Sequence, residues 1–124
     1  VIAVIGDGGI QMTIQELGTI MQTGVEVKIM ILNNQFLGMV RQWQQLFNDK
    51  RYSFVDIQSP DYVMVAKAYG IEGAKISHRH ELEVGIKTML AHKGSYLLEV
   101  MVGKENNVFP MVPQGCSVSE IRLK

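Results

Sequence analysis

The chain has 124 residues, which is long enough for one compact domain with a hydrophobic core. Its 12 lysine and arginine residues balance 12 aspartate and glutamate residues, so no charge excess would attract nucleic acid or an anionic membrane. No apolar run approaches the roughly 20 residues that a membrane-spanning helix needs, and the lone Cys116 cannot form an internal disulfide. We therefore expect a cytoplasmic protein that binds neither nucleic acid nor a membrane.

The first predicted strand, 1–5, is apolar throughout, which is typical of a strand buried on both faces of a parallel sheet. Because the chain opens directly on it, we expect a domain that is truncated at its N-terminal side, just upstream of a central strand. A glycine-rich turn, 6–9, follows. Thr13 and Glu16 have the spacing of a capping box, so a helix is predicted to begin near Thr13 and to end at Gly24.

The rest of the chain alternates between strand and helix patterns, and residues 51–59 are expected to be irregular. Strands are predicted at 27–32, 74–77 and 96–102, and helices at 38–48, from Pro60 to Gly70, and at 81–92, the last with Leu82, Ile86, Met89 and Leu90 facing inward. Such alternation predicts an α/β fold with three α/β/α layers and a mostly parallel sheet. We expect one domain over 1–102, followed by an extended C-terminal tail over 103–124.

Polar residues follow the first two predicted strands at the point where each strand ends. Asp7 lies in the turn after the first strand, and Asn33-Asn34 follows the second. The carboxyl ends of parallel strands meet at one edge of a sheet, so Asp7 and Asn34 should lie close together. Glycine allows the backbone to approach a phosphate closely, and carboxylate and amide oxygens are hard ligands that suit Mg²⁺.

Other interpretations of these residues are weaker. Alone, Asp7 would be a helix-capping residue and Asn33-Asn34 a turn at the end of a strand. A dinucleotide-binding turn requires Gly-x-Gly-x-x-Gly, and the sequence from Gly6 lacks the final glycine. A Walker loop is excluded because no Gly-Lys-Ser/Thr follows. The histidines, His78, His80 and His92, are expected to face solvent or to cap a helix and not to bind a metal, and Cys116 is expected to have no catalytic role.

Taken together, Gly6-Asp7-Gly8 followed after 24 residues by Asn33-Asn34 resembles the motif of thiamine-diphosphate enzymes. Several other stretches resemble the catalytic large subunit of one family of these enzymes, the acetolactate synthases. They are Gly38-Met39-Val40-Arg41-Gln42-Trp43-Gln44, Pro60-Asp61-Tyr62, Ala68-Tyr69-Gly70-Ile71 and Glu105-Asn106-Asn107-Val108-Phe109-Pro110-Met111-Val112-Pro113. The resemblance covers essentially the whole chain and implies the C-terminal domain of that subunit, with the thiamine-diphosphate-binding fold.

The resemblance also implies roles for individual residues. The Mg²⁺ ligands would be the side chains of Asp7 and Asn34 and the backbone carbonyl of Phe36, and the amides of Gly8 and Gly9 would hold the diphosphate. Met39, Val40 and Trp43 would line the substrate site, although the pattern alone favours core packing for Met39 and Trp43. The complete set implied to bind the cofactor is Gly6, Asp7, Gly8, Gly9, Met12, Asn34, Phe36, Leu37, Gly38 and Met39.

Acetolactate synthases condense two pyruvates, or pyruvate with 2-oxobutanoate, and release CO2 in the biosynthesis of isoleucine and valine. The resemblance implies an activating glutamate and an FAD-binding domain outside this chain, so no catalytic residue is expected here and the fragment alone is expected to be inactive. It also implies a homodimer or tetramer with a small regulatory subunit. Two alternatives stay open: another thiamine-diphosphate enzyme (a 2-oxo acid decarboxylase, pyruvate oxidase or glyoxylate carboligase), or a non-catalytic assembly module.

Overall fold

The computed structural model describes residues 1–123 and contains one sheet of four parallel strands. The strands are β1 (Ile2–Gly6), β2 (Lys28–Asn33), β3 (Glu72–Ile76) and β4 (Tyr96–Met101). Their order across the sheet is β1-β2-β4-β3, so that β2 and β4 are central and β1 and β3 form the edges. The predicted parallel α/β sheet is confirmed.

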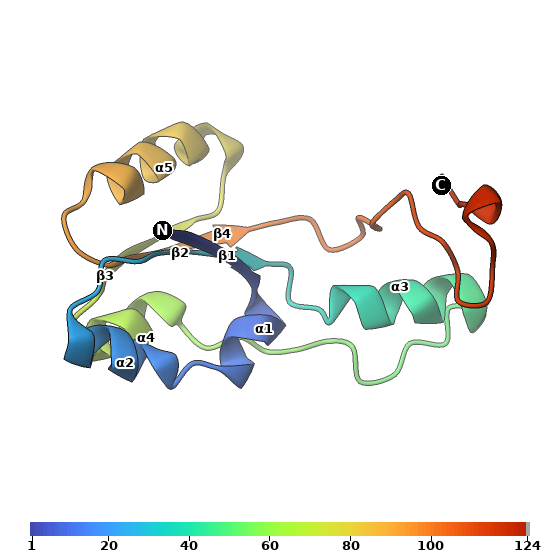
Figure 1. Ribbon diagram of the computed structural model, residues 1–124, viewed down its shortest axis with the longest axis horizontal. Helices are drawn as coiled ribbons and strands as arrows, with labels where there is room; N and C mark the ends of the chain where they lie inside the picture. The colour runs from blue at the N-terminus through green and yellow to red at the C-terminus, as the bar shows by residue number, and fades with distance from the viewer. Residues whose placement is uncertain (124) are drawn as a thin grey trace.

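Helices cover both faces of the sheet and give the predicted three layers (Figure 1). On one face lie α1 (Asp7–Met12), α2 (Glu16–Thr23) and α4 (Tyr62–Ala68). The other face carries α5 (Leu82–Ala91), which continues a 3-10 turn, η1 (Arg79–Glu81). Among the described residues, no helix has the length and apolar character to span a bilayer.

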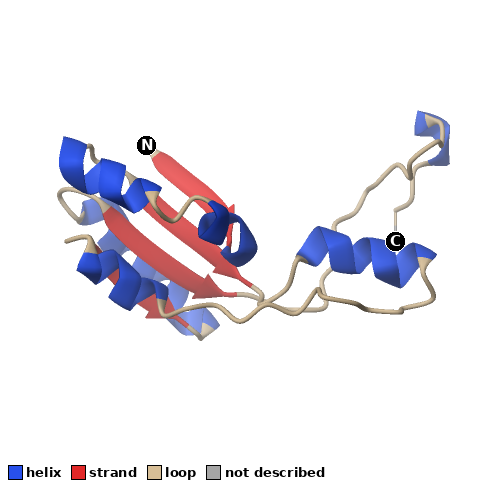
Figure 2. Cartoon of the chain, turned by 90° about the horizontal axis from the view of Figure 1, so that it is seen from below, coloured by secondary structure: helices blue, strands red, loops and turns tan. Residues whose placement is uncertain are grey.

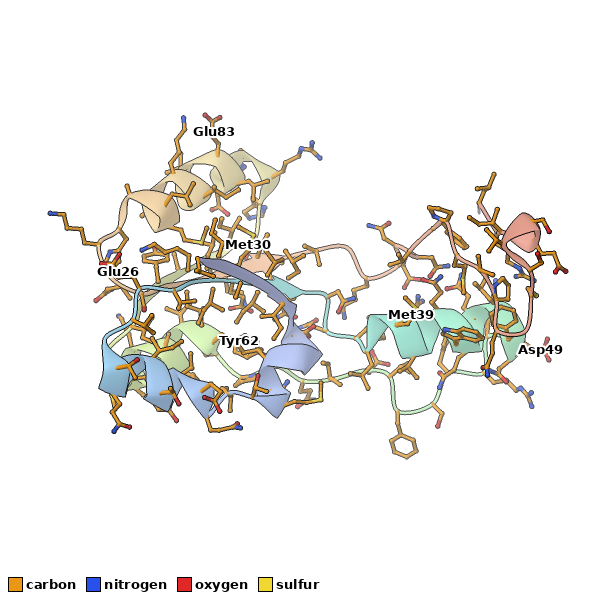
Figure 3. The ribbon with its side chains drawn as sticks, in the orientation of Figure 1. Glu26, Met30, Met39, Asp49, Tyr62 and Glu83 are labelled. Carbon is orange, nitrogen blue, oxygen red and sulfur yellow. The ribbon has the colours of Figure 1, made fainter. Side chains whose placement is uncertain are left out.

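The core has one apolar cluster on each face of the sheet. Figure 3 shows Tyr62 on the side of α4 and Met30 on the side of α5. The buried members of the first cluster are Ile10, Leu17, Ile29, Ile31, Tyr62, Ala66, Ile71 and Leu97, and those of the second are Ile76, Met89, Tyr96, Leu98 and Val100. Because alternate residues of a strand point to opposite faces, the central strand β4 supplies Leu97 to one cluster and Leu98 to the other. This double burial explains its largely apolar sequence, which only Glu99 interrupts.

An arm extends from the carboxyl ends of the strands, away from the layered part of the molecule (Figure 2). It consists of α3 (Gly38–Phe47), the irregular segment after it, and residues 103–123, which include a 3-10 turn, η2 (Val118–Glu120). The Gln42 side chain joins α3 to the tail by hydrogen bonds to Val108 and Met111. Its Nε2 donates to the Val108 carbonyl over 3.0 Å, and its Oε1 accepts from the Val108 amide over 2.7 Å.

A buried arginine makes the second connection between α3 and its surroundings. The Arg41 guanidinium is paired with the Glu105 carboxylate of the tail. It also lies 5.0 Å from the ring centre of Phe36 and 4.7 Å from that of Tyr52, which are cation–π distances. Only 7% of Arg41 is exposed. The tail is therefore folded back onto α3 and is not a free extension.

The prediction for the first helix was wrong. The helix begins at Asp7, directly after β1, and Thr13 ends it by donating its amide to the Ile10 carbonyl over 3.1 Å. A second helix, α2, then begins without any side-chain cap, and the Glu16 carboxylate accepts from the Thr19 hydroxyl instead of closing a capping box. Thr13 and Glu16 thus lie at the boundary between two short helices, and neither side chain forms the predicted cap. Gly24 ends α2 at a φ of 66°, as predicted.

The other helix and strand predictions hold to within two residues, but two burial predictions were wrong. The first strand lies at an edge of the sheet within residues 1–123, and Val4 is 61% exposed because no helix covers the α5 side of β1. On α5, Met89 is fully buried but Leu90 is 53% exposed and Leu82 36% exposed. Adjacent helical residues point about 100° apart, so a helix that meets the sheet along the Met89 line turns Leu90 away from it.

The close pairing of β3 with β4 requires glycine at position 73. A Cβ atom there would lie 2.7 Å from the backbone carbonyl oxygen of Leu97, which cannot move without disturbing a central strand. We expect Gly73→Ala to lower the free energy of unfolding by about 1–3 kcal/mol. Gly18→Ala, inside α2, is the matched control, because a Cβ at this position would make an ordinary 3.6 Å contact with the Tyr69 side chain. It should raise stability by about 0.5–1 kcal/mol, and equal effects in denaturant titrations would contradict this packing account.

Candidate functional site

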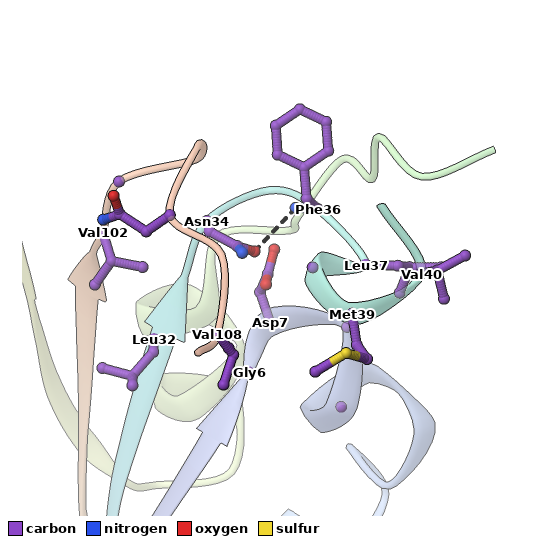
Figure 4. A pocket seen from close by; sticks show the side chains of 15 residues that line it. Gly6, Asp7, Leu32, Asn34, Phe36, Leu37, Met39, Val40, Val102 and Val108 are labelled. Carbon is purple, nitrogen blue, oxygen red and sulfur yellow. Dashed lines mark hydrogen bonds between the residues drawn. The ribbon is translucent and has the colours of Figure 1, made fainter. Parts of the chain in front are cut away.

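A cleft of about 630 Å³ opens where β1 and β2 end and α3 begins (Figure 4). It lies at the carboxyl edge of the parallel strands, which is where open α/β sheets bind their ligands. The sheet contributes the ends of three strands, α3 contributes its first turn, and the tail closes one side. The lining residues are Gly6, Asp7, Gly8, Gly9, Leu32, Asn34, Phe36, Leu37, Gly38, Met39, Val40, Val102, Gly103, Asn106 and Val108.

Asp7 is held in a fixed position at the end of β1. Its side chain is buried, with 1% of the residue exposed. Carboxylate oxygen Oδ2 accepts hydrogen bonds from the Gln35 amide and from the Ser59 hydroxyl, both over 3.0 Å, while the Tyr62 hydroxyl donates to the Asp7 carbonyl over 2.8 Å. Both side-chain bonds use Oδ2, so the other oxygen, Oδ1, takes no part in this anchoring.

Asn34 is held by the turn that follows β2. Its side-chain oxygen Oδ1 accepts from the Phe36 amide over 3.0 Å, the bond drawn in Figure 4. Segment 55–57 holds the same turn from outside: the Leu37 amide donates to the Val55 carbonyl over 2.8 Å, and the Ile57 amide donates to the Gln35 carbonyl over 3.1 Å. Neither of these bonds uses the carbonyl oxygen of Phe36.

The oxygen atoms at the cleft suit a divalent metal bound to a phosphate group. Asp7 offers one carboxylate, Asn34 an amide oxygen and Phe36 a backbone carbonyl, all hard ligands of the kind that Mg²⁺ prefers. Because Asp7 is the one carboxylate among these three ligands, no second acidic ligand would repel the negatively charged diphosphate. The glycines keep the space open, because a Cβ on Gly8 would lie 2.8 Å from Leu37 Cδ2 and one on Gly38 would lie 3.1 Å from Asn34 Nδ2. The residues present therefore fit such a group.

All but two of the residues predicted for the site line this one cleft. Asp7 and Asn34, which are far apart in the sequence, point into it together (Figure 4). Met12 does not line the cleft and is 77% exposed at the far end of α1. Trp43 does not line it either, and its ring packs against Phe47 with 4.8 Å between ring centres. The cofactor role of Met12 and the substrate role of Trp43 stay predictions without support from this arrangement.

Sequence reasoning missed five residues of the cleft: Leu32, Val102, Gly103, Asn106 and Val108. The first three lie at or just beyond the ends of β2 and β4, so the rule that ligands bind at the carboxyl ends of strands could have identified them. Asn106 and Val108 had no such signal. They reach the cleft because Gln42 binds the tail, a contact across 66 residues that no local pattern reveals.

The histidines and the cysteine lie outside the cleft. The rings of His78 and His80 stack at 5.5 Å in an exposed position next to α5, in agreement with the expected solvent-facing role. Cys116 is exposed in the tail. Over residues 1–123 there is no group of three or more His, Cys, Asp or Glu side chains that could hold a metal ion. A site of one carboxylate and two neutral oxygens, such as the one above, is not a group of that kind.

Comparison with known proteins identifies the class to which this fold and cleft belong. Residues 1–100 match the family model of the thiamine pyrophosphate enzymes, C-terminal TPP binding domain, and the chain belongs to that family. A solved relative is the thiamine diphosphate-dependent 4-hydroxybenzoylformate decarboxylase of Rhodococcus jostii RHA1. It superimposes with a TM-score of 0.75 at 29% sequence identity, over 82% of this chain and 19% of that protein.

Within this class, several relatives of the chain are subunits of acetolactate synthases. It is 46% identical to the acetolactate synthase isozyme 2 large subunit of Escherichia coli K12, over 100% of this chain and 23% of that protein. It is 42% identical to the mitochondrial acetolactate synthase catalytic subunit of Saccharomyces cerevisiae, over 97% of this chain and 18% of that protein. The resemblance to acetolactate synthase large subunits is thus confirmed, and the chain spans about a fifth of the length of these relatives.

The Tyr62 hydroxyl holds the backbone of Asp7, and measuring the free energy of unfolding without this hydroxyl tests its contribution. Burial is the main cause that raises the pKa of Tyr62 above its ordinary value of 10.0, so the buried phenol keeps its proton and donates to Asp7. Tyr62→Phe should lower the free energy of unfolding by about 1 kcal/mol below pH 10. A raised folded-state pKa stabilises the protein below the unfolded pKa, and this contribution is lost as the pH rises through the folded value.

The variant should therefore lose less stability than the wild type when the pH is raised above 10, as measured by urea titrations on both sides of that value. Tyr52→Phe, at a tyrosine that is 42% exposed, is the control and should change neither quantity. A parallel alkaline loss of stability in the wild type and Tyr62→Phe would show that Tyr62 does not carry this effect.

Proposed function

We propose that this chain is the cofactor-binding part of the catalytic subunit of an acetolactate synthase. The observation that carries the proposal is the single cleft in which the buried Asp7 and the Asn34 side chain meet a glycine-lined wall. Two further findings support it: the match to the TPP-binding domain family and the identity of 40–46% to several acetolactate synthase large subunits. The reaction would join two pyruvates, or pyruvate and 2-oxobutanoate, with loss of CO2.

In this proposal the cleft holds thiamine diphosphate through Mg²⁺. Asp7 through its carboxylate, Asn34 through its side-chain oxygen and Phe36 through its carbonyl would bind the metal, and the Gly8 and Gly9 amides would bind the diphosphate. When bound, the thiazolium ring of the cofactor would supply the nucleophilic carbon for the chemistry of 2-oxo acids. The contribution of the chain is to fix the diphosphate end, and thereby the position of the reactive ring, through side chains that are already hydrogen-bonded in place.

The apolar part of the cleft would surround the reacting end of the cofactor. Met39 is 50% exposed and Val40 48% exposed on the first turn of α3, and Val102 and Val108 face the same space from β4 and the tail. Such side chains exclude water and thereby strengthen electrostatic interactions within the site. We propose Met39 and Val40 as the surface against which a small 2-oxo acid lies, with Trp43 acting through the position of α3.

The remaining parts of the activity would come from outside residues 1–124. We propose that the activating glutamate and an FAD-binding domain belong to other regions, that the active form is a homodimer or tetramer with a small regulatory subunit, and that this chain alone is inactive. For the compartment, a cytoplasmic location stays our proposal, while the yeast relative is described as mitochondrial.

The metal role of Asp7 can be tested by binding. Asp7→Asn in the full-length enzyme should weaken Mg²⁺ affinity in the presence of thiamine diphosphate by more than about 100-fold, because loss of a supporting partner alone costs 10–100-fold. Titration calorimetry measures this directly. Asp61→Asn is the matched control: it removes one carboxylate charge at the cap of α4, where asparagine caps equally well. Unchanged Mg²⁺ affinity in Asp7→Asn would exclude Asp7 as a ligand.

The reaction itself is tested by the products formed from pyruvate. The full-length enzyme should yield 2-acetolactate and CO2, identified by mass spectrometry, and the isolated chain of 124 residues should yield neither. The structural similarity to a decarboxylase makes the competing outcome specific. Acetaldehyde as the main product would assign the chain to a 2-oxo acid decarboxylase, and acetyl phosphate would assign it to an oxidase.

A further inference from the structure

Three buried polar residues form a connected row beneath the cleft, one from each of three neighbouring strand ends. They are Asp7 after β1, Asn33 at the end of β2 and Glu99 in β4, and each is only 1% exposed. Asp7 belongs to the site proposed above. Asn33 and Glu99 do not line the cleft and have no role in the proposed function. Their position below Asp7 and Asn34 calls for a physical explanation.

Glu99 is the most costly of the three. It lies in a central strand between the fully buried Leu98 and the buried Val100, yet it carries a carboxylate. One oxygen, Oε1, accepts from Asn33 Nδ2 over 2.7 Å and from Lys75 Nζ over 3.1 Å. The other, Oε2, is buried without a hydrogen-bond partner among the described residues. Because an apolar residue of similar size is often at least as stable as a buried ion pair, folding alone gives no reason for glutamate here.

The contact with Asn33 supplies that reason. Because Nδ2 of Asn33 points to Glu99, the oxygen Oδ1 of the same amide points the other way, where it accepts from the Gln35 amide over 3.1 Å. The same Gln35 amide also donates to Asp7 Oδ2 over 3.0 Å. Gln35 has a φ of 58°, a left-handed conformation that a non-glycine residue adopts only at a cost. Two acceptors on one amide hold this turn, and Asn34 and Phe36 lie on either side of it.

We propose that Glu99 is a positioning residue for the metal site, acting through Asn33 and the Gln35 amide on Asp7, Asn34 and Phe36. The inference rests on the proposed function, since it assigns a role toward the same Mg²⁺–diphosphate group. Glu99 touches none of the proposed ligands. Glu99 orients the side-chain amide of Asn33, and Asn33 then holds the Gln35 amide. The position of Gln35 sets the spacing between the Asp7 oxygen and the oxygens of Asn34 and Phe36.

Lys75 is the second partner of Glu99 and provides the matched control. Its side chain is 48% exposed on the edge strand β3, so water reaches the ammonium group, whereas the side chain of Glu99 is 1% exposed. Lys75→Met removes a contact of the same Oε1 atom but leaves the Asn33–Glu99 bond in place. If Glu99 acts through Asn33, loss of the Asn33 contact must therefore affect the metal site, whereas loss of the Lys75 contact must not.

The experiment uses the full-length enzyme and two measurements. The first is the Mg²⁺ dissociation constant with saturating thiamine diphosphate. The second is hydrogen exchange of the segment that contains the Gln35 amide, in the enzyme without metal or cofactor. Glu99→Met, which removes the acceptor, should raise the Mg²⁺ dissociation constant about 10- to 100-fold and speed exchange at Gln35. Glu99→Gln keeps an oxygen for Asn33 and should restore most of both properties, and Lys75→Met should change neither.

A merely structural Glu99 would give a different result. In that case Glu99→Met would lower the free energy of unfolding but leave the Mg²⁺ dissociation constant within twofold and Gln35 exchange unchanged, and either unchanged value overturns the inference. If Glu99→Met does not fold, Glu99→Asp replaces it: the carboxylate is one methylene shorter, withdraws from Asn33, and must move both readouts in the same direction. Failure of the wild type to bind Mg²⁺ would instead overturn the proposed function, while Gln35 exchange still tests the network.

Discussion

The hydrogen bond from the Gln35 amide to the Asp7 carboxylate is the interaction on which the cleft depends. It joins the end of β1 to the turn after β2 across 28 residues, over 3.0 Å. The parallel sheet brings these two strand ends to the same edge, but the sheet alone would leave each turn free to point elsewhere. The bond makes them one unit, in which Asp7, Asn34 and Phe36 line a common space. The proposed chemistry of the chain begins from that convergence.

Much of the fold and of the cleft could be predicted because the signals were local. Apolar runs marked the strands, Gly24, Gly70 and Gly94 marked the ends of helices with φ values of 66°, 69° and 88°, and the positions of Asp7 and Asn34 relative to their strands placed them at one edge. The misses share a cause. The exposure of β1, the folding back of the tail onto α3 and the link from Glu99 to Asn33 all depend on partners distant in sequence or on which neighbours a strand has.

The capping box at Thr13 shows a different limit. The spacing of Thr13 and Glu16 is real, but the chain had already begun a helix at Asp7, directly after the strand. The N-cap position of that helix is occupied by Gly6, which has no side chain to cap it, while the Asp7 side chain bonds to Gln35 and Ser59. The turn after β1 thus follows the requirements of the cleft and not those of helix propensity, as is common where sites impose local irregularity.

The start of helix α3 carries residues of two kinds side by side. Met39 and Val40 line the cleft, and Arg41 and Gln42 directly after them bind the tail. Since a helix moves as a rigid rod over so short a length, these four residues share one displacement. The two sides of the cleft are therefore held differently: the strand ends are anchored in the core, whereas α3 and the tail hold each other in place, so that a change in residues 103–108 would also shift Met39 and Val40.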